Sequence, residues 1–278
     1  MKHDVIGTYD RAAHLYDQVG ARRFTYFDGL LVERLNIPLG AHVLDLASGR
    51  GAMLLAAAEK VGASGRVVGI DLAPQMVALT QAEIERRGLT QASILLMDAD
   101  DPAFEPESFD FITIGFALSF LDFEHLLPKL HNLLKPGGTF AAAQTYNPTD
   151  NKEDFARWSW LFDLTKAVFP PDFSPPAAWI APRRLSKPDQ NVAALTQAGF
   201  VDVRTEAHPT TFYFRDENDW WDWEWSQGSR FWVEGMSPEG LDRFKRESFE
   251  HLRAMQTPQG IPMSDGALFA FGNKKLNK

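Results

Sequence analysis

The chain has 278 residues, which is enough for one large α/β domain or a core domain with a cap. Its formal net charge is −9. The acidic balance disfavours a partner with a phosphate backbone, and the absence of cysteine excludes disulfides and thiolate metal sites. The N-terminus has no apolar core of signal-peptide length, and no apolar run approaches about 18 residues. We therefore expect a cytoplasmic protein without a membrane span that does not bind nucleic acid.

Residues 4–36 carry apolar side chains at near-helical spacing, which predicts that this region is helical. Its aromatic residues include Tyr9, Tyr16 and Phe24. The sequence I-P-L-G at 37–40 should end the helical region before the first strand.

Residues 43–51, which read V-L-D-L-A-S-G-R-G, combine a strand with a turn of small residues, and a helix is predicted from Ala52 onward. A strand, a glycine turn and a helix N-terminus together let the backbone approach a ligand closely. A second buried strand at 67–71 ends in Asp71, which is placed to accept hydrogen bonds from the two ribose hydroxyls of a nucleotide-like cofactor. The alternative is a glycine turn that serves topology only.

The glycines of this turn do not fit the dinucleotide fingerprint G-x-G-x-x-G. Instead, the acidic residue Asp45 stands directly ahead of the small residues. A carboxylate at that place suits a cofactor with a positive group nearby and would repel a pyrophosphate.

The run D-x-A-x-G-x-G, with Asp71 at the end of the second strand, resembles the class I S-adenosylmethionine (SAM) dependent methyltransferases. Within them it is most similar to the group that includes the ubiquinone/menaquinone C-methyltransferases and many small-molecule methyltransferases. Ala47 stands where a glycine is usual, and Ser48 where a cysteine is usual. The resemblance implies that Asp71 holds the ribose, and that Asp45 and residues 47–51 hold the methionine portion.

In the resembled family, an N-terminal helical segment with a Tyr-Asp pair folds over the cofactor. Both Tyr9-Asp10 and Tyr16-Asp17 qualify for this role, with amphipathic packing as the alternative. Residues 93–97 are predicted to be a third strand, closed by the acidic or small residues 98–101. The resemblance makes Asp98 and Ala99 the adenine contacts, and a solvated loop is the alternative.

A fourth strand at 109–114 leads into residues 115–120, which should face cofactor and substrate because ligands of open α/β sheets bind beyond the carboxyl ends of the strands. A helix from about 122 to 134 ends in the turn L-K-P-G-G at 134–138, another match to the family, and residues 139–143 should form a fifth strand. The alternation of strands and helices over 41–146 requires a parallel sheet with right-handed crossovers.

Beyond residue 146 the resemblance holds only in outline. The predicted elements there are a helix at 155–169, a proline-rich crossing that reaches Pro182, a helix at 188–198, a strand from 200 that can extend to 214, a helix at 238–255 and a last strand at 267–271. We expect the last strand to be the antiparallel edge strand of a doubly wound, Rossmann-like, seven-stranded sheet that is otherwise mostly parallel, with helical cap insertions.

All eight tryptophans lie between Trp158 and Trp232. On one helix, Trp221, Trp225 and Trp232 would share a face. This region suits a cap that encloses an apolar or aromatic substrate, and ordinary core packing is the alternative.

These predictions describe one methyltransferase domain over residues 1–278. Its parts are a helical cover at 1–36, a SAM-binding core at 37–146, a helical and proline-rich cap insertion at 147–186, core again at 187–214, a tryptophan-rich helical cap at 215–260, and the last core strand with the tail at 261–278.

The site residues follow from the motifs and the resemblance. The predicted cofactor-binding residues are Tyr16, Asp45, Ala47, Ser48, Gly49, Gly51, Asp71, Leu72, Met76, Asp98, Ala99, Asp100 and Phe116. The predicted substrate pocket contains Tyr9, Phe24, Ser119, Tyr146, Trp221 and Trp225. No metal is predicted, because the seven histidines show no ligand spacing.

Methyl transfer from a sulfonium is an in-line displacement that needs no protein nucleophile. Proximity and orientation can supply on the order of 7–11 kcal/mol of the acceleration. The segments after the fourth and fifth strands offer no strong base, so we expect catalysis chiefly by positioning, with His14 as the best of the base candidates. A surface or packing role is the alternative for His14.

The sequence therefore predicts an enzyme that transfers a methyl group from SAM to an O, N or C atom of a small, largely apolar or aromatic metabolite and releases S-adenosylhomocysteine. We expect a monomer or a homodimer. One alternative is a SAM-binding protein of the same fold with a pericyclase-like or regulatory role. An NAD-type oxidoreductase is disfavoured by the missing fingerprint, and a macromolecular substrate by the acidic charge.

Overall fold

The computed structural model describes residues 2–146, 152–175 and 184–276, and these form two compact units. The sheet unit comprises residues 24–146, 184–208 and 267–276, and the helical unit comprises residues 2–23, 152–175 and 209–266. Strands β6 (Val201–Phe214) and β7 (Ile261–Asn273) have residues in both units. The predicted organisation as one domain with cap segments is not decided by this division and stays a prediction.

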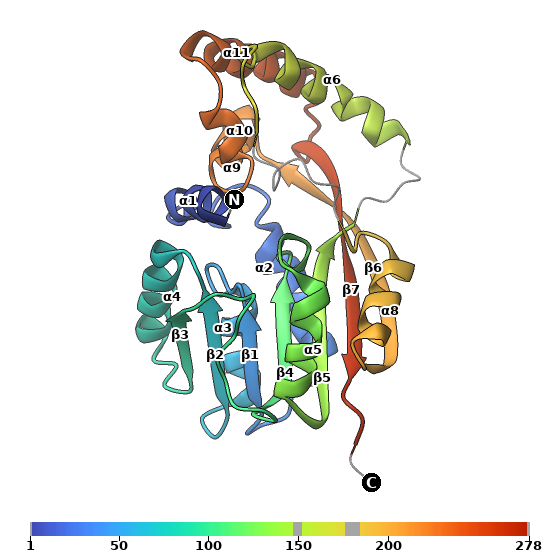
Figure 1. The fold of residues 1–278 in the computed structure, drawn as a ribbon. Helices are drawn as coiled ribbons and strands as arrows, with labels where there is room; N and C mark the ends of the chain where they lie inside the picture. Colours follow the sequence, from blue (N-terminus) through green and yellow to red (C-terminus); the bar gives the residue numbers. More distant parts are fainter. Residues whose placement is uncertain (1, 147–151, 176–183, 277–278) are drawn as a thin grey trace. The chain divides into compact units, whose positions relative to one another are not determined.

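The sheet has seven strands in the order β3-β2-β1-β4-β5-β7-β6 (Figure 1). Its first five strands are β1 (His42–Leu46), β2 (Arg66–Asp71), β3 (Ala92–Leu96), β4 (Phe109–Gly115) and β5 (Leu134–Thr145). All neighbours among these five pair in parallel, whereas β5 and β7 pair antiparallel. The prediction of a doubly wound, mostly parallel, Rossmann-like sheet is confirmed.

The last strand is antiparallel as predicted, but the prediction that it lies at the edge is wrong. β7 lies between β5 and β6, so β6 forms the edge of the sheet on this side. Residues 266–272 of β7 are all buried, whereas β6 is exposed or half-buried along nearly all of its length. An unbroken apolar run is typical of an interior strand covered on both faces, and a strand that carries charges suits an edge.

Three helices cover one face of the sheet: α2 (Arg23–Arg34), α3 (Ala52–Val61) and α4 (Pro74–Arg87). All of α2 except Arg23 belongs to the sheet unit. Two glycines permit this close packing. A Cβ atom on Gly69 of β2 would lie 2.3 Å from Leu54 Cδ1 of α3, and one on Gly115 of β4 would lie 2.9 Å from the Asp28 carboxylate of α2. A larger residue at Gly69 would clash with the fully buried Leu54, and one at Gly115 would require the Asp28 side chain to shift.

The other face carries α5 (Phe123–Leu133) and α8 (Pro188–Gln197), which lie next to each other in Figure 1. Leu126 and Leu130 of α5 and Leu195 of α8 pack on Ile112 and Phe140 of the sheet, and all five are nearly or fully buried. This cluster is the main core of the sheet unit.

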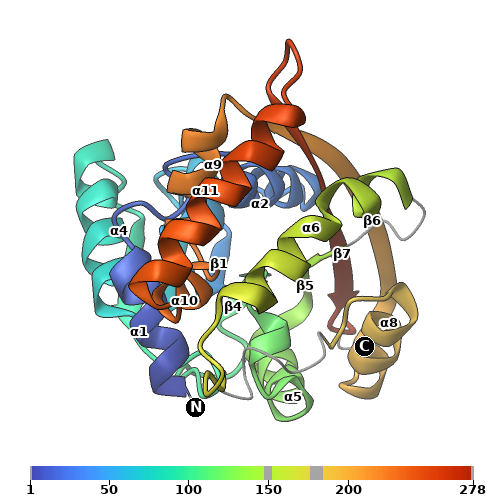
Figure 2. The ribbon, with the colours of Figure 1, turned by 90° about the horizontal axis from the view of Figure 1, so that it is seen from above.

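The helical unit contains α1 (Lys2–Ala12), α6 (Lys152–Val168), α9 (Glu217–Trp225), α10 (Arg230–Glu234) and α11 (Pro238–Ala254). α11 packs along α6 and also contacts α9 (Figure 2). The core of this unit holds Trp220, Phe244 and Leu252 with Phe214 at the end of β6. The Trp220 and Phe244 ring centroids are 6.1 Å apart.

The prediction of helix throughout 4–36 is wrong over residues 13–22, which separate α1 from α2. The backbone there is left-handed at Asp17, Gly20 and Arg22, with φ of 54°, 66° and 46°. A Cβ atom on Gly20 would lie 2.7 Å from Trp223 Cβ, so the chain at Gly20 is shaped by packing against a tryptophan that is distant in sequence. A continuous helix cannot accommodate these conformations.

The prediction that Trp221, Trp225 and Trp232 share one helix face is also wrong. α9 ends at Trp225 and Trp232 belongs to the separate helix α10. Two hydroxyl groups end α9 by donating to its last carbonyls, Ser226 Oγ to Trp223 O at 2.8 Å and Ser229 Oγ to Glu224 O at 2.7 Å.

The remaining predicted helices agree with α5, α6, α8 and α11 to within three residues at each end. The predicted turn at 134–138 falls inside the bounds of β5. There the pairing of β5 with β4 shifts register between Phe109 and Phe111. The predicted proline-rich crossing at 176–183 lies outside the described residues. None of the helices in the described ranges is long and apolar enough to cross a membrane.

The interior position of β7 predicts different costs for a lysine at two alanines of the sheet unit. Ala270 of β7 is 1% exposed, whereas Ala207 of β6 is exposed. Ala270→Lys should lower the free energy of unfolding by at least about 3 kcal/mol because it buries a charge without a partner. Ala207→Lys should change it by no more than about 0.5 kcal/mol. Denaturant unfolding measures both, and equal losses would contradict the strand order.

Candidate functional site

The chain leaves β1 through a turn with left-handed backbone at Ala47, Gly49 and Gly51, where φ is 49°, 53° and 78°. Gly51 directly precedes α3, and a Cβ atom there would lie 2.8 Å from Thr80 Cγ2 of α4. Thr80 Oγ1 also donates a hydrogen bond to Gly49 O at 2.9 Å. Gly51 combines a left-handed conformation with a close approach that a larger residue could not make.

Asp45 lies within β1 beneath this turn and is 1% exposed. Its Oδ2 accepts from Ser48 Oγ at 2.6 Å, and its Oδ1 accepts from Thr113 Oγ1 of β4 at 2.8 Å. Burial raises the pKa of Asp45 to about 6, although the two hydroxyl hydrogen bonds act in the opposite direction, and the nearby Asp71 carboxylate raises it further. The carboxyl group thus joins β1, the turn and β4 in one polar network.

Asp71 ends β2, and two backbone N–H groups hold its carboxylate. Gly49 N–H donates to Asp71 Oδ2 at 2.8 Å, and Ala73 N–H donates to Oδ1 at 2.9 Å. A carboxylate oxygen has two lone pairs and can accept more than one hydrogen bond. A carboxylate fixed in this way can bind two adjacent hydroxyl groups of a ligand.

A third acidic group follows β3. Asp98 Oδ1 accepts from Asp100 N–H at 3.0 Å, and Ala99 between them is buried. Asp100 Oδ1 accepts from Asp122 N–H at 2.9 Å, directly before α5 begins. One oxygen of Asp100 is therefore engaged in positioning α5. Of the apolar cofactor residues predicted beside this edge, Leu72 is half-buried and Met76 is 2% exposed.

The structure brings together two aromatic residues that were predicted for different parts of the site. Phe116, directly after β4, has a left-handed backbone with φ of 56°, and its N–H donates to Ala143 O at 2.8 Å. Its ring meets that of Phe24 of α2 edge to face at 5.2 Å. Ser119 lies in the short helix η1 (Leu118–Phe120), and Tyr146 follows β5; both are half-buried.

The other predicted site residues belong to the helical unit. The rings of Tyr9 and Tyr16 meet edge to face at 5.8 Å, and those of Trp221 and Trp225 do so at 6.1 Å. His14 is exposed in the segment between α1 and α2. Within the described ranges, no group of three or more His, Asp or Glu residues could hold a metal ion, and the expectation of no metal stays a prediction.

Three polar residues with contacts to this site were missed by sequence reasoning: Thr80, Thr113 and Asp28. Thr113 left a readable signal, since it is a polar residue between two isoleucines in the strand F-D-F-I-T-I-G. Thr80 and Asp28 gave none, because a single polar residue on a helix is ordinarily exposed.

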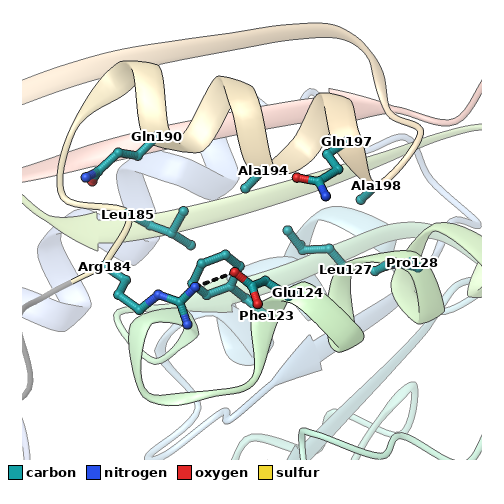
Figure 3. A pocket seen from close by; sticks show the side chains of 10 residues that line it. All are labelled: Phe123, Glu124, Leu127, Pro128, Arg184, Leu185, Gln190, Ala194, Gln197 and Ala198. Carbon is teal, nitrogen blue, oxygen red and sulfur yellow. Dashed lines mark hydrogen bonds and ion pairs between the residues drawn. The ribbon is translucent and has the colours of Figure 1, made fainter.

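A separate hollow of about 400 Å³ lies between α5 and α8 (Figure 3). At its mouth Arg184 pairs with Glu124 at 2.5 Å and stacks 4.2 Å above the Phe123 ring. It contains none of the predicted cofactor or substrate residues. We therefore do not assign it to the site at the carboxyl ends of the strands.

The buried Asp45 predicts a specific dependence of stability on pH. Because its folded pKa of about 6 exceeds the ordinary value of 3.8, the folded state holds the proton more tightly, and Asp45 lowers stability as pH rises from about 4 to 6. The difference in unfolding free energy between the natural protein and Asp45→Asn should fall by up to about 1.4 kcal/mol per pH unit in this window and level off above it. Denaturant unfolding at several pH values measures this difference, and a constant difference would contradict the buried, titrating carboxyl group.

Comparisons with known proteins relate this chain to methyltransferases. Residues 43–138 match the family described as "Methyltransferase domain". A nocamycin O-methyltransferase from Saccharothrix syringae is 32% identical over 236 residues, which cover 83% of this chain and 84% of that protein. A demethylmenaquinone methyltransferase from Geobacillus kaustophilus is 27% identical over 214 residues, 73% of this chain and 90% of that protein.

The crystal structure of the YcgJ protein from Bacillus subtilis has the same fold, with a TM-score of 0.59 at 19% identity over 91% of this chain and 99% of that one. These relatives confirm the resemblance to SAM-dependent methyltransferases that the D-x-A-x-G-x-G run indicates. The chain belongs to the class I SAM-dependent methyltransferases, and SAM is its cofactor.

Proposed function

We propose that the protein transfers a methyl group from SAM to an oxygen, nitrogen or carbon atom of a small, largely apolar or aromatic metabolite, mainly by proximity and orientation. The observation that carries the proposal is the Asp71 carboxylate, anchored by Gly49 and Ala73 beside the glycine turn. The name of the nocamycin relative favours oxygen among the three acceptor atoms.

The residues present fit SAM. Asp71 is proposed to bind the ribose hydroxyls, and Asp98 with the buried Ala99 to bind adenine. Leu72 and Met76 are proposed to supply apolar contacts beside that ring.

The methionine portion is proposed to lie on the turn formed by Ala47, Ser48, Gly49 and Gly51. Asp45, buried beneath that turn, would act on a positive group of the cofactor through its field and by fixing Ser48, since both of its oxygens already accept hydrogen bonds. When bound, SAM supplies a methyl group activated on a sulfonium.

The role of the chain is then to hold the acceptor in line with that methyl group. Residues 115–120 and 143–146, at the ends of β4 and β5, contain no His, Lys, Asp or Glu. Phe116 and Phe24 instead supply an apolar surface there, which excludes water and holds an aromatic acceptor. His14 is the proposed base if the acceptor is not already ionised.

The substrate roles of Tyr9, Trp221 and Trp225 and the cofactor role of Tyr16 rest on the sequence alone. The cytoplasmic location and the monomeric or dimeric state also stay predictions. A non-methylating, SAM-binding role is the second candidate function, and the missing base at the ends of β4 and β5 is the observation that favours it.

Replacement of Asp71 tests the cofactor pose. Asp71→Ala should weaken SAM binding at least tenfold in calorimetry, about 1.4 kcal/mol, because the ribose loses its acceptor and Gly49 loses its anchor. Asp163→Ala, an exposed acidic residue of α6, is the matched control and should bind SAM as the natural protein does. Unchanged affinity in Asp71→Ala would contradict the pose, and thermal unfolding checks that the variant is folded.

The reaction is tested by incubating purified protein and deuterated-methyl SAM with small-molecule extract of the source organism. Mass spectrometry should find one enzyme-dependent species that gains the labelled methyl group. No labelled species, with SAM binding confirmed, would support the non-methylating role. In the same assay, unchanged turnover of His14→Ala across pH would remove His14 as a base.

A further inference from the structure

The carboxyl end of β5 carries a buried amide for which the proposed function gives no role. Gln144 is 2% exposed, and its Nε2 atom has no hydrogen-bond partner among the described residues. Burying an amide donor without a partner is unfavourable, because the hydrogen bonds that it made to water are lost. Such groups are few in native proteins, and each needs an explanation.

The position of Gln144 in the sheet indicates what would pair with it. Its neighbour Ala143 pairs with Gly115, the last residue of β4, after which the left-handed Phe116 redirects the chain. Gln144 therefore lies one residue beyond the end of β4, while on its other side it pairs with Leu268 of β7. Ligands of open α/β sheets bind in the crevice beyond the strand ends, which is where this residue lies.

The face of the sheet on which the amide lies follows from strand alternation. Side chains two residues apart share a face, so Gln144 is on the same side as Ala142. Ala142 belongs to the core cluster that includes Leu118 of η1, and η1 contacts β5. The amide is therefore on the η1 side, where Ser119 was predicted to line the substrate pocket.

The surroundings of the amide are apolar. Ala142, on the same face of β5, and Leu268, the partner of Gln144 on β7, are both fully buried. An unpaired amide NH2 group in such a setting selects a ligand with an oxygen acceptor on an apolar body, because an apolar ligand alone would leave the donor unpaired.

We propose that Gln144 Nε2 donates a hydrogen bond to an oxygen atom of the methyl acceptor, so that the acceptor is an apolar or aromatic molecule that carries an oxygen acceptor such as a carbonyl group. This proposal rests on the proposed methyl transfer and names the chemical class of its substrate. Gln144 is a substrate-binding residue in this assignment, and cofactor binding does not depend on it.

The first test needs no substrate. Gln144→Met keeps the length of the side chain and removes the donor, so its thermal midpoint should equal or exceed that of the natural protein, and its SAM affinity should stay within twofold. A markedly lower midpoint would show that the amide is bonded within the protein. A SAM affinity reduced as strongly as in Asp71→Ala would place Gln144 in the cofactor site. Either result would overturn the proposal.

The second test uses a matched pair of probes, 1-naphthol and 2-acetyl-1-naphthol, which differ by the carbonyl group beside the hydroxyl. In calorimetry with S-adenosylhomocysteine present, the natural protein should bind the ketone at least tenfold more tightly. Gln144→Met should reduce this preference to within about twofold, and Gln144→Glu should abolish binding of the ketone because two acceptors would face each other.

Three outcomes of the probe experiment would overturn the proposal: no preference in the natural protein, a preference unchanged in Gln144→Met, or no binding of either probe. The measurement reports binding rather than turnover, so it can fail while the labelled-methyl assay succeeds. The failure of this inference is thereby distinguishable from the failure of the proposed methyl transfer.

Discussion

The structure of the site depends on one buried carboxyl group, that of Asp45. Its two oxygens accept from hydroxyls on separate parts of the chain, Ser48 in the turn and Thr113 in the neighbouring strand. Burial makes the ionised form costly, as the raised pKa shows, and yet the group stands in the first strand of the sheet. The carboxyl group fixes positions: the turn cannot shift relative to β1 without breaking the Ser48 hydrogen bond, and β4 cannot shift without breaking that of Thr113. Either break would leave a buried polar atom unpaired.

The position of this turn also fixes the Asp71 carboxylate. The N–H of Gly49 is directed at Asp71 Oδ2, and the carbonyl of the same residue accepts from Thr80 of α4. The glycine turn and the acid at the end of β2 are therefore one hydrogen-bonded assembly. Because the groups proposed to bind the cofactor are held in place by hydrogen bonds within the protein, less entropy would be lost when a ligand is bound.

Features that depend on residues adjacent in the sequence could be predicted, whereas contacts between residues far apart in the sequence could not. Strands and helices over 43–143 were predicted closely, since a strand, a turn and a helix are specified by adjacent residues. The interior place of β7 was missed although its unbroken apolar run indicated it. The partnership of Asp45 with Thr113 spans 68 residues, and the break before α2 depends on Gly20 meeting Trp223. Such contacts exist only after the chain has folded, so local patterns cannot predict them.

The distribution of polar groups along the carboxyl edge of the sheet bears on the chemistry. Asp45, Asp71 and Asp98 gather on β1, β2 and the end of β3, the side proposed for a cationic cofactor. Residues 115–120 and 143–146, at the ends of β4 and β5, include no charged residue, and Gln144 supplies a neutral donor there.

When an ionised oxygen attacks a sulfonium, opposite charges cancel as the new bond forms. A neutral, water-excluding surface favours this step because it does not stabilise the separated charges as water does. A single amide donor can orient the acceptor oxygen without the strong stabilisation that a lysine or arginine would give its charge. The lack of a cationic residue among residues 115–120 and 143–146 therefore suits an oxygen nucleophile.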